Sequence, residues 1–270
     1  MSDRNYNEAQ GLRWSTLKTA LVSGKALQHA LVTPRADTTA LGLGRAIHIA
    51  TLTSDTPDLL PAEHLTASGA VSTSAKTRAW LAERGECYSP ADWETAKRIA
   101  FEINLHPIAS ETLDLCEVRE QPVYWTETVD GVEIPCKACP DLYGKAGILA
   151  DLKSHGRGAL DDRGVVGAIL RYGYAGQLAW YERGLLANGM PVLEWRLLFV
   201  ESSAPHDVYV AQLGEDWRAF GREQAERALA VYASGTFDGV APGLVRLELP
   251  AWLAETADSS DVDDLGLEGM

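Results

Sequence analysis

The chain has 270 residues, of which 46% are hydrophobic, and its formal net charge at pH 7 is −14. This length suits one large domain, or a domain with a helical extension, and the apolar content is ample for a core. The acid excess argues against a protein that holds a polyanion through a global positive field, because phosphate neutralisation normally requires excess Lys and Arg. Any nucleic-acid binding must therefore rest on a local basic lining, on metal, or on enclosure of the substrate.

The sequence contains no apolar segment of about twenty residues, and its first ten residues lack the apolar core of a secretory signal. We therefore expect a soluble, cytoplasmic protein that does not associate with membranes. Four cysteines do not make a disulfide framework in so long a chain. Cys136 and Cys139 have the spacing of a ligand pair for zinc or an iron-sulfur cluster, but we expect them to be small strand residues.

The first part of the chain is predicted to be helical. Apolar periodicity indicates two short helices within residues 12–31 and one helix over residues 38–52, with His48 on its inner side. Residues 55–74 are rich in Pro, Ser, Thr and Asp, which predicts a loop. Residues 75–105 are predicted to form two further helices, and their many basic side chains are typical of a solvated face.

Turn signals predict how the next strands pair. Asp130-Gly131 is a strong two-residue hairpin turn, and strands pairing about it place Glu120 opposite Asp141. The next reversal is centred on Ala146, and the same count places Asp141 opposite Asp151. Three acids are therefore expected to line up across three adjacent strands.

The strand that contains Asp151 also carries a lysine. Because side chains alternate along a strand, Asp151 and Lys153 project from one side while Ile148, Ala150 and Leu152 pack on the other. Acids at cross-strand distance repel and raise one another's pKa unless a cation lies among them. Oxygen ligands in this number suit Mg²⁺ or Mn²⁺.

The remaining elements alternate helix and strand. A long helix is predicted from about residue 162 to residue 188, followed by strands over residues 193–200 and 208–213 and a helix over residues 215–234. Residues 255–270 contain six acids and no basic residue, so we expect a disordered tail.

The spacing of Pro140-Asp141, nine intervening residues and Asp151-Leu152-Lys153 resembles the PD-(D/E)xK nuclease superfamily. The resemblance implies an α/β fold, with a restriction-endonuclease-like core in which helices flank a mixed central sheet. On this interpretation residues 1–254 form a single nuclease domain with a helical N-terminal part, and residues 255–270 form the acidic tail.

Two further patterns refine the resemblance. Gly44 precedes His48 by four residues at the start of an apolar run. On the predicted long helix, three side chains form one stripe, namely Tyr174, Gln177 and Tyr181. Together with the acids, these patterns resemble the RecB-like nucleases, and most closely the RecE-type exonucleases of phages and prophages, over a region from about Trp14 to Trp252.

The resemblance assigns roles to the acid cluster. Asp141 and Asp151, with the main-chain carbonyl of Leu152 and with His48, are expected to hold one or two divalent ions, Mg²⁺ or Mn²⁺. Lys153 is expected to position the attacking water or to stabilise the charge of the pentacoordinate phosphate. Glu120 is expected to be a second-metal ligand or a water-orienting base.

A second group of residues is expected to contact DNA. Gln177 and Tyr181 are expected to act in the catalytic centre by holding the strand being cut, and Tyr174 lies on the same stripe. Three basic side chains downstream of the catalytic strand are expected to line the approach to Asp151, namely Arg157, Arg163 and Arg171.

The RecE-type resemblance implies a metal-dependent exodeoxyribonuclease. It would digest linear double-stranded DNA from 5′ ends and leave 3′ single strands for recombination, as a ring-shaped homo-oligomer with a single-strand annealing protein as a partner. The alternatives are an inactive or accessory DNA-binding member of the same fold, or another RecB-like nuclease that is an endonuclease or single-strand-specific. A third is a metal-independent binding module whose acids form surface ion pairs with Lys137 and Lys145.

Overall fold

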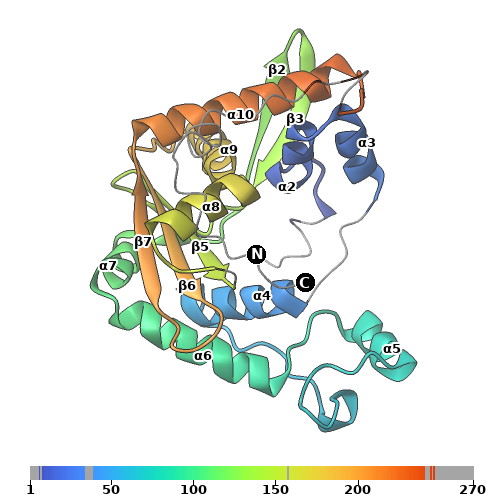
Figure 1. Cartoon of the computed structure of the whole chain (residues 1–270), viewed down its shortest axis with the longest axis vertical. Coiled ribbons are helices and arrows are strands. Elements are labelled where there is room, and N and C mark those ends of the chain that lie inside the picture. The colour runs from blue at the N-terminus through green and yellow to red at the C-terminus, as the bar shows by residue number, and fades with distance from the viewer. Residues whose placement is uncertain are drawn as a thin grey trace, which may run out of the picture.

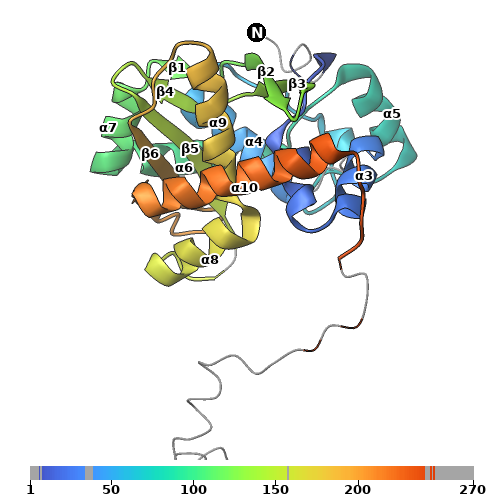
Figure 2. The ribbon, with the colours of Figure 1, turned by 90° about the horizontal axis from the view of Figure 1, so that it is seen from above.

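The computed structural model of the protein describes residue 6 and residues 8–33, 39–156, 158–240, 244 and 246. Its centre is a five-stranded sheet with the order β1-β4-β5-β6-β7, whose strands are labelled in Figures 1 and 2. Only β5 and β6 run parallel, and the other neighbours are antiparallel. The strands are β1 (Val118–Arg119), β4 (Leu142–Gly144), β5 (Ile148–His155), β6 (Glu194–Glu201) and β7 (Val208–Leu213). The predicted α/β fold with a mixed sheet is confirmed.

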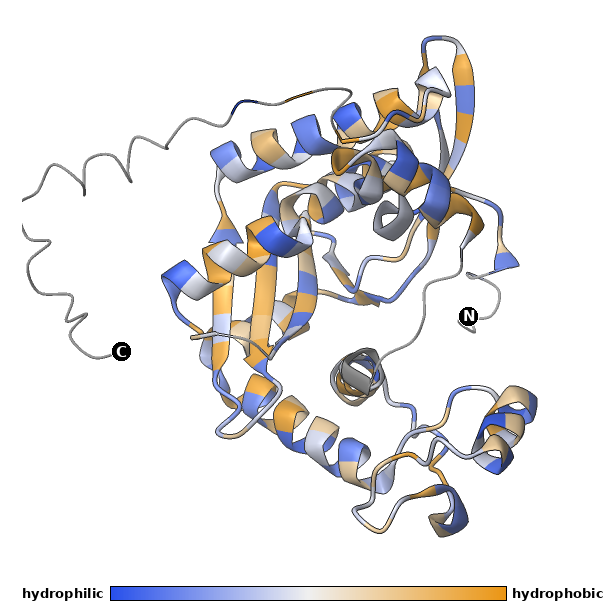
Figure 3. Ribbon diagram, turned by 45° about the vertical axis from the view of Figure 1, so that its right-hand side comes forward, coloured by the Kyte–Doolittle hydropathy of each residue, from blue (hydrophilic) through white to orange (hydrophobic). Residues whose placement is uncertain are grey.

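Helices cover both faces of this sheet (Figures 1 and 2). One face packs against α4 (Thr39–Leu52), α6 (Pro90–Leu105) and α7 (Pro107–Leu115) through Ile148, Ala150 and Leu152 of β5. The other face, which includes Leu149, packs against α8 (Asp162–Tyr172), α9 (Tyr174–Ala187) and α10 (Glu215–Ser234). Figure 3 shows the consequence: the strands are largely hydrophobic, whereas the helices alternate between hydrophobic and hydrophilic residues.

A second layer packs on α9 away from the sheet. It consists of the N-terminal helices and a separate hairpin, whose elements are α2 (Trp14–Leu17), η1 (Lys18–Leu21), α3 (Gly24–Val32), β2 (Val123–Val129) and β3 (Val132–Ala138). The Trp125 ring of β2 lies 4.9 Å from that of Trp180 on α9. The remaining short elements, η2 (Ala62–His64) and α5 (Ala75–Arg84), belong to the segment between α4 and α6.

The two predicted registers are confirmed. Val129 pairs with Val132 across the Asp130-Gly131 turn, and both turn residues have positive φ, 49° and 80°, as this turn type requires. Arg119 pairs with Leu142, and Leu142 pairs with Ala150. Extending each of these pairings by one residue places Glu120 beside Asp141 and Asp141 beside Asp151, and the three strands are neighbours in the order β1-β4-β5.

Two details of the sequence-based scheme are wrong. The hairpin does not extend the central sheet. Strands β2 and β3 form a separate two-stranded sheet, which Leu12 joins through one parallel bridge to Cys136, and they leave the central sheet after β1 to pack on α9. The predicted long helix is two helices, because Gly173 adopts a left-handed φ of 70° and ends α8. Helix α7 was not predicted, since Pro107 suggests a break, yet Pro at the first helical position is compatible with a helix.

In the part of the chain that the structure describes, no helix is long and apolar enough to cross a membrane. The proposed boundary at residue 254 and the acidic tail over residues 255–270 lie outside the described residues.

Candidate active site

The site forms where the sheet opens beside β5. Strand β4 pairs with β5 only as far as Leu142 and Ala150, so among the described residues no strand pairs with the following residues of β5 on that side. The main chain of Leu152 is bonded by side chains instead. Its N–H donates to Asp141 Oδ2 at 2.8 Å, and its carbonyl oxygen lies 3.2 Å from His48 Nε2. Helix α4, which carries His48, passes close to this end of β5 (Figure 1).

Glu120 and His48 complete this side of the cluster. The Glu120 N–H donates to the Asp141 carbonyl oxygen at 2.9 Å. His48 Nδ1 lies 3.6 Å from Glu120 Oε1 and 3.6 Å from Asp141 Oδ1. Glu120 has a φ of 46°, which is uncommon outside glycine and costs about 1–3 kcal/mol. Backbone strain of this kind persists only where the surrounding structure enforces it. Here the strained residue is one of the clustered acids.

On the α9 side, Lys153 forms an ion pair with the fully buried Asp151. Its ammonium also donates to Gln177 Oε1 at 3.1 Å and lies 4.6 Å from the centre of the Tyr174 ring. Gln177 Nε2 donates to the Tyr181 hydroxyl at 2.6 Å and approaches Asp151 Oδ1 at 3.5 Å. The helical stripe therefore encloses the ion pair, and every one of these contacts joins residues that the sequence had singled out.

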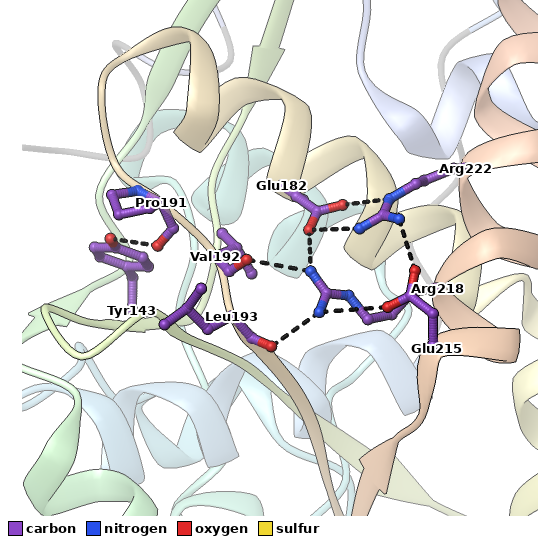
Figure 4. Close-up of polar contacts among 8 residues, drawn as sticks. All are labelled: Tyr143, Glu182, Pro191, Val192, Leu193, Glu215, Arg218 and Arg222. Carbon is purple, nitrogen blue, oxygen red and sulfur yellow. Dashed lines mark hydrogen bonds and ion pairs between the residues drawn. The ribbon is translucent and has the colours of Figure 1, made fainter.

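A buried ion-pair network holds α9 in place (Figure 4). Glu182, next to Tyr181, accepts hydrogen bonds from Arg218 at 2.6 Å and from Arg222 at 3.0 Å, both on α10. Arg218 also donates to the main-chain oxygens of Val192 and Leu193, at 3.1 and 2.9 Å. One guanidinium thus joins α9, α10 and the loop that enters β6.

We expect Glu182→Ala to lower the free energy of unfolding by about 3–5 kcal/mol, because it leaves the largely buried Arg218 without its buried carboxylate and with only the exposed Glu215, 3.7 Å away. Urea denaturation measures this loss. Glu226→Ala is the matched control, since Glu226 is 68% exposed, lies 3.9 Å from Arg183, and should contribute less than about 1 kcal/mol. Equal losses in the two variants would show that the network does not anchor α9.

The cluster has strongly shifted ionisation. Burial and the Asp141 charge raise the pKa of Asp151, and the Lys153 ammonium offsets only part of this rise. For Lys153, burial lowers the pKa, but the charges of Asp151 and Asp141 outweigh it and raise the pKa. Burial also lowers the pKa of His48, yet Asp141 and the contact with Glu120 raise it to about 9. At neutral pH two cations, Lys153 and protonated His48, therefore balance the acids.

This balance predicts how the metal-free protein responds to pH. The folded-state pKa of His48, about 9, lies above its ordinary value of 6.5, so its stabilising contribution is complete below 6.5 and is lost as pH rises through 9. The pKa of Asp151, raised from 3.8 to about 7, acts with the same sign at lower pH, because ionising its buried carboxyl destabilises the fold as pH rises from 3.8 to 7. In EDTA, the Tm of the wild-type protein should fall between pH 6.5 and 9. The Tm of the His48→Gln variant should fall less steeply over the same range. An equally steep fall in His48→Gln would assign the pH dependence elsewhere.

The donor atoms suit a hard divalent ion. Asp151 Oδ2 is buried and bonded to the Lys153 ammonium, and the two oxygens of a carboxylate have further lone pairs for a cation. The 3.2 Å between His48 Nε2 and the Leu152 oxygen is near the roughly 3 Å that separates adjacent ligands of an octahedral Mg²⁺ bound at about 2.1 Å. Within the described ranges, however, no three His, Cys, Asp or Glu side chains converge as a complete ligand set. Binding would require loss of the His48 proton and a shift of the acids.

The arginines predicted to line the approach to Asp151 make no hydrogen bond or ion pair with the acid cluster among the described residues. Arg163 and Arg171 are exposed on α8, and no hydrogen bond or ion pair among the described residues links either to the acids. Arg157 lies outside the described residues.

Two other sequence-based alternatives can be compared with the structure. Lys145 pairs with Glu117, and Lys137 is buried and donates to the main-chain oxygens of Tyr6 and Ala9. The described ion pairs of the acid cluster are instead with His48 and Lys153, so the surface ion pairs of a metal-independent module are not found. Cys136 is buried and its thiol donates to the Ile134 oxygen.

Tyr172 borders the site and was missed. Its ring centre lies 5.5 Å from that of Tyr174, which covers Lys153. The sequence held one signal, the glycine between the two tyrosines, which permits a helix to end there.

Comparison with known proteins identifies the fold and the family. No curated protein matches the chain. A crystal structure of a protein from Eubacterium rectale, described as a "Putative exonuclease", superposes with a TM-score of 0.57 at 14% identity and covers 96% of this chain and 98% of its own. At this identity the likeness shows the fold alone. The crystal structure of SSO0001 is 14% identical, has a TM-score of 0.30, and covers 74% of this chain and 88% of its own.

A family profile provides the remaining comparison. The match runs over residues 15–243, from the N-terminal helices to beyond α10, and so includes every described residue of the acid cluster and of the α9 stripe. The chain therefore belongs to the family described as the PDDEXK-like domain of unknown function (DUF3799).

Proposed function

We propose that the protein is a divalent-metal-dependent DNA exonuclease. The observation that carries the proposal is the acid cluster at the open edge of β5, with Lys153 paired to Asp151 beside it. The PD-(D/E)xK family match supports a nuclease, and nucleases of this kind generally use divalent metal ions. The similar structure described as a "Putative exonuclease" motivates the exonuclease part of the proposal.

Each requirement of phosphodiester hydrolysis has a candidate group. Asp141, Asp151, His48 and the Leu152 carbonyl would hold Mg²⁺ or Mn²⁺. When bound, the ion polarises the phosphate and lowers the pKa of a bound water. Lys153 lies beside Asp151, where a fixed ammonium can orient the attacking water or stabilise the added negative charge.

The surrounding residues position these groups. Gln177 fixes the Lys153 ammonium through its Oε1 and is itself bonded to Tyr181. A substrate strand lying on α9 would meet this stripe, together with Tyr174. Glu120, whose side chain is 35% exposed, is placed to orient the water or to take part in a second metal site.

Substrates that differ only in their ends test the exonuclease assignment. Linear duplex DNA should be degraded to nucleotides, whereas a covalently closed circle of the same sequence should persist. Selective loss of a 5′ label before a 3′ label would establish 5′ to 3′ digestion and leave 3′ single strands suited to an annealing partner. Cleavage of the closed circle at a comparable rate would identify an endonuclease instead.

The net charge of −14 motivates a proposal about assembly. A ring of subunits that encloses the duplex would keep an acidic protein on DNA without a large basic surface. Mutations that split such an oligomer should make digestion distributive and more salt-sensitive, while deleting residues 255–270 should change the rate only modestly. A light-scattering mass of one chain, combined with processive digestion, would rule out the ring.

A further inference from the structure

The break between α8 and α9 brings two tyrosines together. Their ring centres are 5.5 Å apart and the ring planes are inclined by 31°. In a continuous helix, residues two positions apart point about 200° away from each other and cannot meet. The left-handed φ of 70° at Gly173 removes this restriction, so the aromatic pair depends on the break.

Two side chains from the N-terminal helices hold the break. Trp14 Nε1 donates to the Gly173 carbonyl oxygen at 3.1 Å, and Lys18 Nζ donates to the Tyr172 carbonyl oxygen at 3.0 Å. The Trp14 ring also lies so close to Gly176 that a Cβ there would be 2.2 Å from it. The end of α8 is thus bound to another part of the fold and does not depend on local propensity alone.

The aromatic pair leads from the surface to the candidate catalytic lysine. Tyr172 is 43% exposed, whereas Tyr174 lies 4.6 Å from Lys153 Nζ and packs against Phe199 with a centroid distance of 6.0 Å. Tyr174 is therefore fixed by its neighbours, and Tyr172 offers ring surface to an incoming molecule. Exposed aromatic rings beside a phosphate-handling site are suited to stacking with nucleobases.

We propose that Tyr172 stacks on an unpaired nucleobase of the strand being cut. This inference rests on the proposed function and specifies its substrate: the strand enters with its base released from the duplex, as at a frayed or single-stranded end. Inside a duplex both faces of a base are covered by neighbouring base pairs, and at a matched end only the outer face of the last pair is open, so a released base gives Tyr172 the most ring surface to contact. In this arrangement the base stacks on Tyr172, which in turn contacts Tyr174, and the phosphate of the same nucleotide lies at Lys153 and Asp151.

The kinetic test uses duplexes of one sequence whose terminal pairs are either matched or mismatched. Stacking on an aromatic ring contributes about 1–3 kcal/mol per base, which corresponds to roughly a 5- to 150-fold change in binding. Tyr172→Ala should raise KM on frayed and single-stranded ends about tenfold or more with little change in kcat. Tyr172→Phe should restore the wild-type KM, because the ring and not the hydroxyl is required. Phe101→Ala is the control, since Phe101 is 61% exposed on the outer side of α6.

A binding measurement separates this inference from the proposed function. An oligonucleotide with terminal 2-aminopurine should lose fluorescence on binding to Asp151→Asn and keep it on binding to the double variant Asp151→Asn/Tyr172→Ala. Equal quenching in both proteins, or a Tyr172→Phe variant as impaired as Tyr172→Ala, would overturn the inference while leaving a metal-dependent nuclease intact. A wild-type protein that cuts no DNA would instead contradict the proposed function, and the quenching would still decide whether Tyr172 contacts a base.

Discussion

Asp151→Asn is expected to reduce metal-dependent cleavage of DNA by more than about 10²-fold while the protein remains folded. Asp151 is the most deeply buried acid of the cluster, and its Oδ2 forms the ion pair with Lys153. Loss of groups that merely orient a metal ligand typically costs 10- to 100-fold, so loss of a ligand should cost at least as much. Initial rates at saturating Mg²⁺ measure the effect.

The same variant should not lose stability in EDTA. Burial and the Asp141 charge raise the pKa of Asp151 to about 7, so ionising it costs more in the folded protein than in water. The neutral amide removes this cost but also removes the Lys153 ion pair, so we expect the Tm in EDTA to hold or rise. Metal should then protect the wild type and not the variant.

A matched control distinguishes this site from a general effect of removing one acid. Asp130→Asn makes the same chemical change at the exposed tip of the β2–β3 hairpin, where Asn-Gly also suits the turn. It should digest DNA at the wild-type rate. If Asp151→Asn is as active as Asp130→Asn, the site assignment is wrong.

Lys153→Met is expected to lower kcat by about 10²-fold or more without weakening metal binding. The ammonium is fixed by Asp151 and Gln177, and a preorganised charge of this kind typically contributes 10²–10³-fold in rate. Removing it leaves the carboxylates in a more negative environment, which favours a divalent cation. Calorimetric titration with Mn²⁺ should therefore show unchanged or tighter affinity.

Lys145→Met provides the comparison, since Lys145 is 83% exposed and pairs with Glu117. It should retain both the wild-type rate and the wild-type metal affinity. A Lys153→Met protein that cuts DNA normally would remove Lys153 from the catalytic centre. One that loses metal affinity would make the lysine a structural support of the metal site.

The strand registers could be predicted because turns of fixed length determine them. Counting outward from Asp130-Gly131 and from Ala146 located the acids on neighbouring strands, and the pairs Arg119–Leu142 and Leu142–Ala150 have these registers. The count works even where pairing ends. Glu120 and Asp141 lie just beyond their strands and are joined through one main-chain hydrogen bond.

Features that depend on tertiary packing could not be predicted in this way. Glycine is tolerated within helices, so Gly173 did not reveal the break that Trp14 and Lys18 hold from another part of the chain. The departure of the hairpin from the sheet likewise follows from packing of Trp125 on Trp180, which has no local signature. Arg163 and Arg171 are exposed on α8 and make no hydrogen bond or ion pair with the acids among the described residues, so the basic lining stays a prediction.

The most direct test of the central claim is the release of nucleotides from uniformly labelled linear duplex DNA by the wild-type protein. We predict acid-soluble label with Mg²⁺ or Mn²⁺, none in EDTA, and release from Asp151→Asn that is slower by more than about 10²-fold with either metal. Release that is equally fast in EDTA, or no release with either metal from protein that is folded and binds the ion, would contradict a metal-dependent nuclease site at the open edge of β5.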